Sequence, residues 1–193
     1  MKKVAKVTRV IMVAPIMALI LCTILLIVKK ESFCNIYMYF TCLLCLSIIP
    51  SLSYIIEKRF HICSKVNPKL SDRDCERRLA IYMSEFSYAL LTLIVFITNQ
   101  SDLLKEMVLT YLFSGSFMLM FMLLKINTSG HACGFIGPVV FLSYSISFWF
   151  LLAFPLLYFV IWSSLKLKRH TLLELASGCL IPVVSFLLAI LII

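Results

Sequence analysis

Two short polar breaks, each with a histidine beside basic residues, interrupt the long apolar runs of this chain. The first break reads Lys125-Ile-Asn-Thr-Ser-Gly-His131, and the second reads Lys166-Leu-Lys-Arg-His170. A histidine can act as a nucleophile or as a general acid and base near neutral pH, and basic side chains bind phosphate oxygens. Because polar groups are costly in hydrocarbon, two such breaks in an apolar chain indicate a function. Together they predict phosphate chemistry at a membrane surface.

The second break is followed by a carboxylate at helical spacing. His170 and Glu174 stand at positions i and i+4, so both side chains lie on one face of a helix that starts here. A carboxylate one turn away holds one ring nitrogen protonated and leaves the other as a nucleophile. Lys166, Lys168 and Arg169 add positive charge for a phosphate dianion. The alternative is a basic, membrane-flanking loop before an ordinary helix.

The first break contains the residues of a helix start that can hold a phosphate. Thr128 or Ser129 is a good N-cap, and Gly130 lets the backbone come close to a ligand. The first N–H groups of a helix lack internal partners and bind anions. His131 in the first turn is then placed to donate a proton. The alternative is an ordinary capped helix with a histidine at the membrane interface.

The motifs in these breaks resemble those of a known enzyme superfamily. TSGHACG, followed later in the chain by WSSLKLKRHTLLELASG, resembles motifs two and three of the type 2 phosphatidic acid phosphatases, roughly PSGH and SRxxxxxHxxxD. SDRDCERR, in the loop before the third apolar segment, is similar to the DRxxR stretch of small bacterial members. The resemblance implies a helical membrane core that hydrolyses phosphate monoesters or diphosphates on lipids, such as phosphatidic acid or a polyprenyl diphosphate.

The resemblance also implies a role for each matching residue. His170 would be the nucleophile that accepts the phosphoryl group, His131 the general acid, and Glu174, where the family has Asp, the group that orients His170. No metal or other cofactor is implied, since basic side chains supply the charge stabilisation. The residues expected to bind phosphate are Ser129, Gly130, Lys125, Lys166, Arg169, Arg73 and Arg77.

The chain departs from the family pattern at two places. Ser164 stands where the family has an arginine six residues before the nucleophile, so a bidentate phosphate clamp is missing there. The family's first motif, KxxxxxxRP, is absent in clean form, and its role would fall to basic residues near both breaks. The candidates for that role are Lys69, Arg73, Arg77, Arg78 and Lys125.

Two alternatives to a phosphatase follow from the same residues. A catalytically weak or inactive family member that binds phospholipid or has a structural role is favoured by Ser164. An intramembrane prenyltransferase is suggested by Asp72-Arg-Asp-Cys-Glu76, since such acidic clusters bind Mg²⁺–diphosphate. Those enzymes use two separated Asp-rich motifs, and only one is present here.

Composition and run lengths predict an all-α, polytopic membrane protein. Of the 193 residues, 62% are hydrophobic and 14% are charged, whereas soluble domains carry about 25% charged residues. The apolar runs match the ~20 residues that a helix needs to cross a bilayer. The predicted segments are about 10–28, 36–56, 79–98, 106–124, 171–193 and the two arms of 132–165, which fold back near 148–154. We therefore expect one domain, 1–193, with six to seven spanning helices and a phosphatase-like core of about 70–193.

Seven crossings would place the N-terminus, a polar loop at 57–78 and both histidine breaks on one side. That side carries every lysine and arginine except Lys29, Lys30 and Lys105, so the positive-inside rule predicts a cytoplasmic location for it. The same rule explains the net charge of +9 without nucleic acid. The expected partners are the bilayer of the cell membrane and a lipid phosphate substrate, and the oligomeric state is left open. Glu85, inside an apolar segment, predicts a functional or helix-pairing site.

Overall fold

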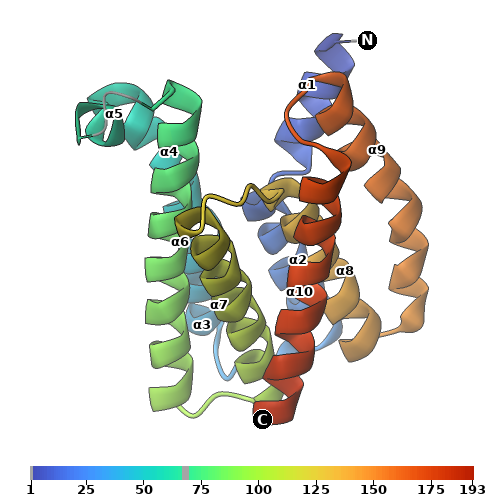
Figure 1. The fold of residues 1–193 in the computed structure, drawn as a ribbon. Coiled ribbons are helices and arrows are strands. Elements are labelled where there is room, and N and C mark those ends of the chain that lie inside the picture. The colour runs from blue at the N-terminus through green and yellow to red at the C-terminus, as the bar shows by residue number, and fades with distance from the viewer. Residues whose placement is uncertain (1, 67–69) are drawn as a thin grey trace.

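The computed structural model describes residues 2–66 and 70–193 and contains only helices and their connections (Figure 1). The elements are α1 (Lys2–Ile11), α2 (Ala14–Val28), η1 (Lys30–Ser32), α3 (Ile36–Leu43), η2 (Leu44–Ile48), α4 (Ile49–Phe60), α5 (Ile62–Val66), α6 (Asp72–Ile97), α7 (Asp102–Leu123), α8 (Gly130–Ser145), η3 (Phe148–Ala153), α9 (Phe154–Lys166) and α10 (Leu172–Ile192). The elements α3, η2 and α4 form one continuous helix, Ile36–Phe60. The prediction of an all-α helical bundle is confirmed.

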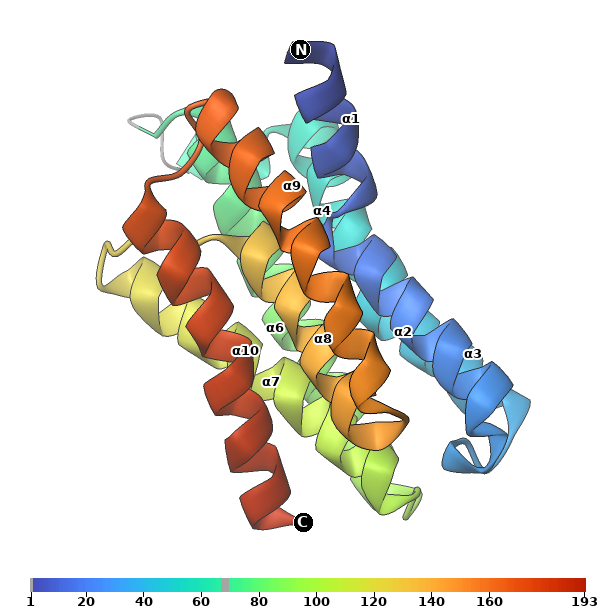
Figure 2. The same ribbon diagram turned by 90° about the vertical axis from the view of Figure 1, so that its right-hand side faces the viewer.

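Within the described residues, five helices are long and apolar enough to cross a membrane, fewer than the six to seven that we predicted. They are Ile36–Phe60, α6, α7, η3 with α9, and α10. The segment predicted over 10–28 breaks between α1 and α2, because Pro15 lacks an N–H and can occupy only the first turn of a helix. The remaining α2, of 15 residues, and α8, of 16 residues, reach about 24 Å or less at ~1.5 Å per residue. They run side by side with the long helices (Figure 2) and contact each other.

The polar loop predicted over 57–78 is wrong in detail, because most of it is helical. The helix α4 continues to Phe60, and α6 starts at Asp72 rather than near Leu79. Ser71 caps α6: its Oγ accepts from the Asp74 N–H at 3.2 Å and donates to Asp74 Oδ2 at 2.6 Å. Acidic side chains in the first turn also favour the positive end of the helix dipole. SDRDCERR therefore forms the first turns of α6. Lys69 lies outside the described residues.

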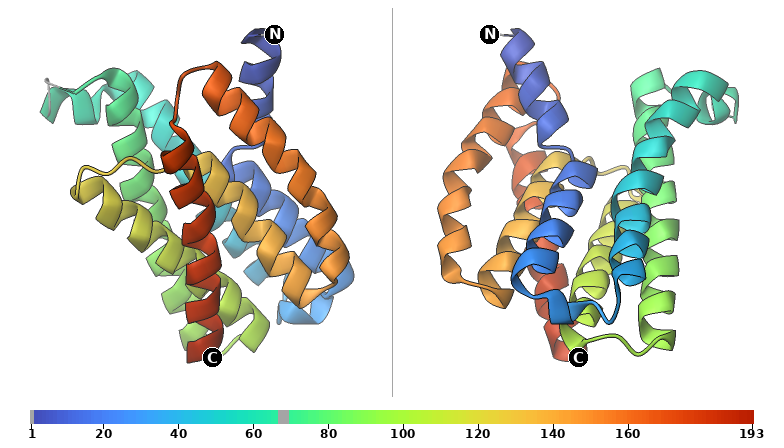
Figure 3. Two further views of the ribbon diagram at one scale, coloured as in Figure 1. Left: turned by 45° about the vertical axis from the view of Figure 1, so that its right-hand side comes forward. Right: turned by 180° about the vertical axis from the view of Figure 1, so that it is seen from behind.

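The long apolar stretch 132–165 folds back where we predicted. The first arm, α8, ends at Ser145, η3 makes the turn, and α9 returns along α8. Hence α1, α5 and the connections α7–α8 and α9–α10 all lie toward one end of the bundle, while η3, the α6–α7 turn and the C-terminus lie toward the other (Figure 3). Both histidine breaks are thus on the same side, as seven alternating segments predicted.

The intramembrane carboxylate Glu85 pairs two helices. Its Oε1 accepts a hydrogen bond of 2.6 Å from Ser116 Oγ, across the contact between α6 and α7. Gly115 makes that contact possible, because a Cβ built at this glycine would collide with Glu85 Oε2 and press on Tyr88. Of the two predicted roles for Glu85, the structure supports helix pairing.

Candidate functional site

The start of α10 holds the histidine–carboxylate pair that the spacing predicted. Thr171 is the N-cap, and its Oγ1 accepts from the Glu174 N–H at 3.3 Å, which fixes the first turn. His170 immediately precedes the cap, and its Nδ1 lies 2.7 Å from Glu174 Oε2. The side chains of His170 and Glu174 are only 8% and 21% exposed. The pair is therefore shielded from water, which strengthens the interaction between the two groups.

The two breaks are joined to each other through Ser129. Its Oγ accepts from the Ala132 N–H at 3.4 Å and caps α8, as predicted. Its backbone N–H donates to the carbonyl oxygen of Glu174 at 2.9 Å. Because Ser129 is fully buried and its N–H is already bonded, it holds α8 against α10 and does not line the cavity described below.

Gly178 allows this close approach of α10 to the first break. A Cβ built at Gly178 would lie 2.5 Å from the Ser129 carbonyl oxygen and 3.1 Å from its Cβ and N atoms. Backbone atoms cannot move aside as a flexible side chain can, so the two breaks would separate. Sequence reasoning did not predict this contact. The available signal was Gly178 itself, a glycine in the interior of an apolar helix.

We expect Gly178→Ala to lower the free energy of unfolding by about 1–3 kcal/mol, the usual cost of overpacking. The measurement is the thermal unfolding midpoint of the purified protein in detergent. Gly137→Ala is the matched control, since a Cβ at Gly137 would meet only Pro182 Cβ at an ordinary 3.5 Å. Equal midpoints for the two variants would contradict the packing argument.

Two arginines at the start of α6 hold both breaks in place. Arg77 donates from Nη1 to Asn127 Oδ1 at 2.6 Å and from Nη2 to the Thr128 carbonyl oxygen at 2.9 Å. Arg73 donates from Nη2 to the Arg169 carbonyl oxygen at 2.8 Å. These contacts bridge sequence separations of 51 and 96 residues, so α6 positions the connections α7–α8 and α9–α10 relative to each other.

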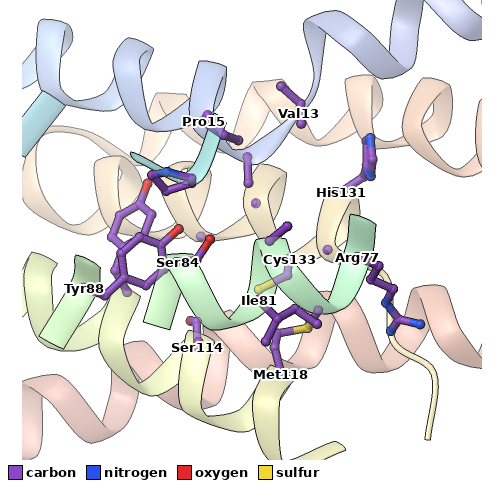
Figure 4. Close-up of a pocket in the computed structure, with 18 of the residues that line it drawn as sticks. Val13, Pro15, Arg77, Ile81, Ser84, Tyr88, Ser114, Met118, His131 and Cys133 are labelled. Atoms are coloured by element: carbon purple, nitrogen blue, oxygen red, sulfur yellow. The ribbon is translucent and has the colours of Figure 1, made fainter. Parts of the chain in front are cut away.

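A cavity of about 270 Å³ opens among these elements and brings together most of the predicted site (Figure 4). Its outer end is lined by His131, His170, Gly130, Arg73, Arg77, Arg169 and Glu76. Three guanidinium groups against one carboxylate leave this end positively charged. Since α8 begins at Gly130, the first backbone N–H groups and the positive end of the helix dipole belong to the same wall. The arrangement can bind an anion beside two imidazoles.

Other predicted residues lie outside this cavity. Lys125 and Lys166 are exposed, and Lys125 lines a neighbouring hollow of about 210 Å³ together with Arg77 and Arg78. Ser164 is fully buried, does not line the cavity, and accepts the Arg169 N–H through its carbonyl oxygen. An arginine at 164 would therefore have to enter packed core before it reached the histidines.

The sequence did not predict the inner end of the cavity. Residues that carry hydroxyl groups line it from three helices: Tyr54, Ser84, Tyr88, Thr110, Tyr111 and Ser114. Figure 4 shows Ser84, Tyr88 and Ser114 at the far end from His131 and Arg77. The spacing of these residues was an available signal. Ser84 and Tyr88 share one helix face inside an apolar segment, and so do Tyr111 and Ser114. Their convergence depends on how α6 and α7 pack.

Comparisons of the chain with models of protein families, with curated proteins and with solved structures find no significant match. The roles assigned below therefore rest on the residues and their geometry.

Proposed function

We propose that this protein is a lipid phosphatase of the type 2 phosphatidic acid phosphatase kind, acting in the cell membrane. The observation that carries the proposal is that two histidines and three arginines line one cavity in a chain with several membrane-length helices. The reaction is hydrolysis of a phosphate monoester or diphosphate on a lipid. The hydrocarbon of the substrate stays in the bilayer while the phosphate occupies the outer end of the cavity.

In the proposed mechanism, His170 is the nucleophile. With a proton on Nδ1 held by Glu174, the lone pair of Nε2 attacks phosphorus. The bond to the lipid oxygen breaks, and His131 protonates that oxygen, so a lipid alcohol leaves. His131 then takes a proton from water as the water oxygen attacks the phosphohistidine, which releases inorganic phosphate and restores both imidazoles.

Arginines of α6 and of the second break supply the positive charge of the site. A phosphoryl group carries negative charge on its peripheral oxygens throughout the transfer, and preorganised donors in a partly buried site stabilise it. Arg77 uses two of its five N–H groups on Asn127 and Thr128, so others remain for the ligand. In this proposal Arg73 and Arg77 take the role of the family arginine at whose position Ser164 stands in this chain.

The function is tested by phosphate release from lipid vesicles or mixed micelles that contain phosphatidic acid or a polyprenyl diphosphate. We expect the purified protein to release inorganic phosphate equally well with and without a chelator of divalent cations. Phosphate release that survives chelation would exclude the prenyltransferase alternative, which requires Mg²⁺ and releases diphosphate. The described residues contain no group of three or more His, Cys, Asp or Glu side chains that could hold a metal ion.

A phospholipid-binding protein without turnover is the second candidate. It is favoured by Ser164 in place of an arginine and by the use of Arg73 and Arg77 in holding backbone carbonyls. Saturable binding of phosphatidic acid with no phosphate release over many hours would support this candidate and overturn the proposal of a phosphatase.

A further inference from the structure

A second hollow, of about 210 Å³, lies beside the cavity of the two histidines and is not used by the proposed reaction. Its polar members are Asp74, Arg77, Arg78, Lys125 and Asn127, and we name it the basic hollow. They come from the first turns of α6 and from the α7–α8 connection, at the end of the bundle where both breaks lie (Figure 3). Among the described residues, Arg77 alone lines both spaces, so one guanidinium group stands between them.

The positive charge of the basic hollow is not balanced by contacts within the described part of the chain. Three cationic side chains stand against one carboxylate, that of Asp74. This carboxylate accepts a hydrogen bond of 2.6 Å from Ser71 Oγ, and no ion pair of the described residues involves Arg78 or Lys125. Like charges held close together repel each other, so an anion placed among them is attracted.

The end of α7 fixes the backbone of Lys125 at the basic hollow. Lys125 has the left-handed conformation, with φ 60°, and its N–H donates to the Met122 carbonyl oxygen at 3.1 Å. The Ile126 N–H donates to the Phe121 carbonyl oxygen at 2.8 Å. These two bonds form the Schellman pattern that ends many helices. The lysine therefore projects from a bonded helix end and not from an irregular loop.

The donors of the basic hollow match the oxygen atoms of a phosphate group. Arg77 Nη1 donates to Asn127 Oδ1 at 2.6 Å, which leaves the N–H groups of the Asn127 amide as donors. The guanidinium of Arg78 and the ammonium of Lys125 add charged donors. A phosphate group carries several strong acceptor oxygens and a negative charge, and such charge-assisted hydrogen bonds are stronger than neutral ones.

We propose that the basic hollow is a second phosphate-binding site, separate from the cavity of the two histidines. Arg78 and Lys125 do not line that cavity, so their charges belong to the basic hollow alone. The ligand is a phosphate group, carried either by the headgroup of an anionic phospholipid or by a free phosphate ion. The site goes beyond the proposed function, because binding in it needs no turnover in the cavity.

The test measures equilibrium binding of two probes to the purified protein in an uncharged detergent. The probes are radiolabelled inorganic phosphate and phosphatidylglycerol, and phosphatidylcholine is the zwitterionic comparison lipid. We expect Arg78→Gln and Lys125→Asn each to raise the Kd of at least one probe about fivefold, the effect of one basic residue on an anion at a membrane surface. Binding of phosphatidylcholine should not change.

Each variant has a matched control. Lys168 is also an exposed lysine in the left-handed conformation at a helix end, with φ 49°, and lines neither space, so Lys168→Asn is the control for Lys125→Asn. Arg59→Gln, in the exposed last turn of α4, is the control for Arg78→Gln. Asparagine tolerates the left-handed conformation, so both lysine variants should keep the wild-type thermal unfolding midpoint, measured on the same samples.

The two probes separate the sources of the phosphate group. Weaker binding of phosphatidylglycerol in the two hollow variants supports the site with a lipid headgroup as its ligand. Weaker binding of inorganic phosphate supports it with a free ion as its ligand. Unchanged binding of both probes, or an equal loss in the hollow variants and their controls, would overturn the site. The basic residues would then reflect only the general excess of positive charge on one side of a membrane protein.

Discussion

His170→Ala is expected to reduce phosphate release by at least about 10³-fold, because it removes the proposed nucleophile. His131 lies on the other break, and in the proposed mechanism it protonates the leaving oxygen, so we do not expect it to replace His170. A rapid quench of wild-type protein with a lipid labelled on the phosphate should trap labelled protein. The label should be stable in base and labile in acid, as a phosphoramidate is, and should be absent from the His170→Ala variant. The measurements are initial rates and label per mole of protein.

The matched control for this variant is His61→Asn. His61 ends α4 in the left-handed conformation, with φ 51°, is exposed and does not line the cavity. Asparagine tolerates that conformation, so the fold should be unaffected. Phosphate release by His170→Ala at the wild-type rate would show that the phosphoryl group is not transferred to this residue.

Arg77→Lys is expected to lower phosphate release by about 10²–10³-fold, the usual cost of losing a transition-state donor. The substitution keeps the charge but not the planar fork, and the fork is what lets one side chain bond Asn127 and Thr128 together while it faces the cavity. Without those two bonds the α7–α8 connection loosens, and His131, in the first turn of α8, loses its fixed position. We therefore expect a lower thermal unfolding midpoint as well.

Arg59→Lys is the matched control for Arg77→Lys. Arg59 lies exposed in the last turn of α4, outside the cavity, so both the rate and the midpoint should stay at wild-type values. If Arg77→Lys lowers the midpoint but leaves the rate unchanged, Arg77 has a structural role only, and charge stabilisation falls to Arg73 and Arg169.

The features that the sequence alone determined are those that depend on near neighbours in the chain. The length and hydropathy of a run decide whether it forms a membrane-length helix, and a spacing of four residues decides that His170 and Glu174 meet. The cap at Ser129 and the reversal at η3 are equally local. Where prediction failed locally, a single residue explains it, since Pro15 splits the first segment and Ser71 starts α6 early.

The tertiary structure decided which of the many basic residues line the candidate cavity. Arg73, Arg77, Lys125 and Lys166 are equivalent as positive charges in a sequence, yet only the two arginines line the cavity. The two arginines are held there by hydrogen bonds to the carbonyl groups of Thr128 and Arg169, which are 51 and 96 residues away in the chain. These carbonyl groups come within reach only when α6 packs beside both breaks. The convergence of Ser84, Tyr88, Tyr111 and Ser114 at the inner end of the cavity likewise depends on the packing of α6 against α7. A hydrogen bond to water and one to protein differ little in free energy, so the residue type cannot tell which one a side chain makes. The packing of the helices determines whether a side chain bonds protein or water.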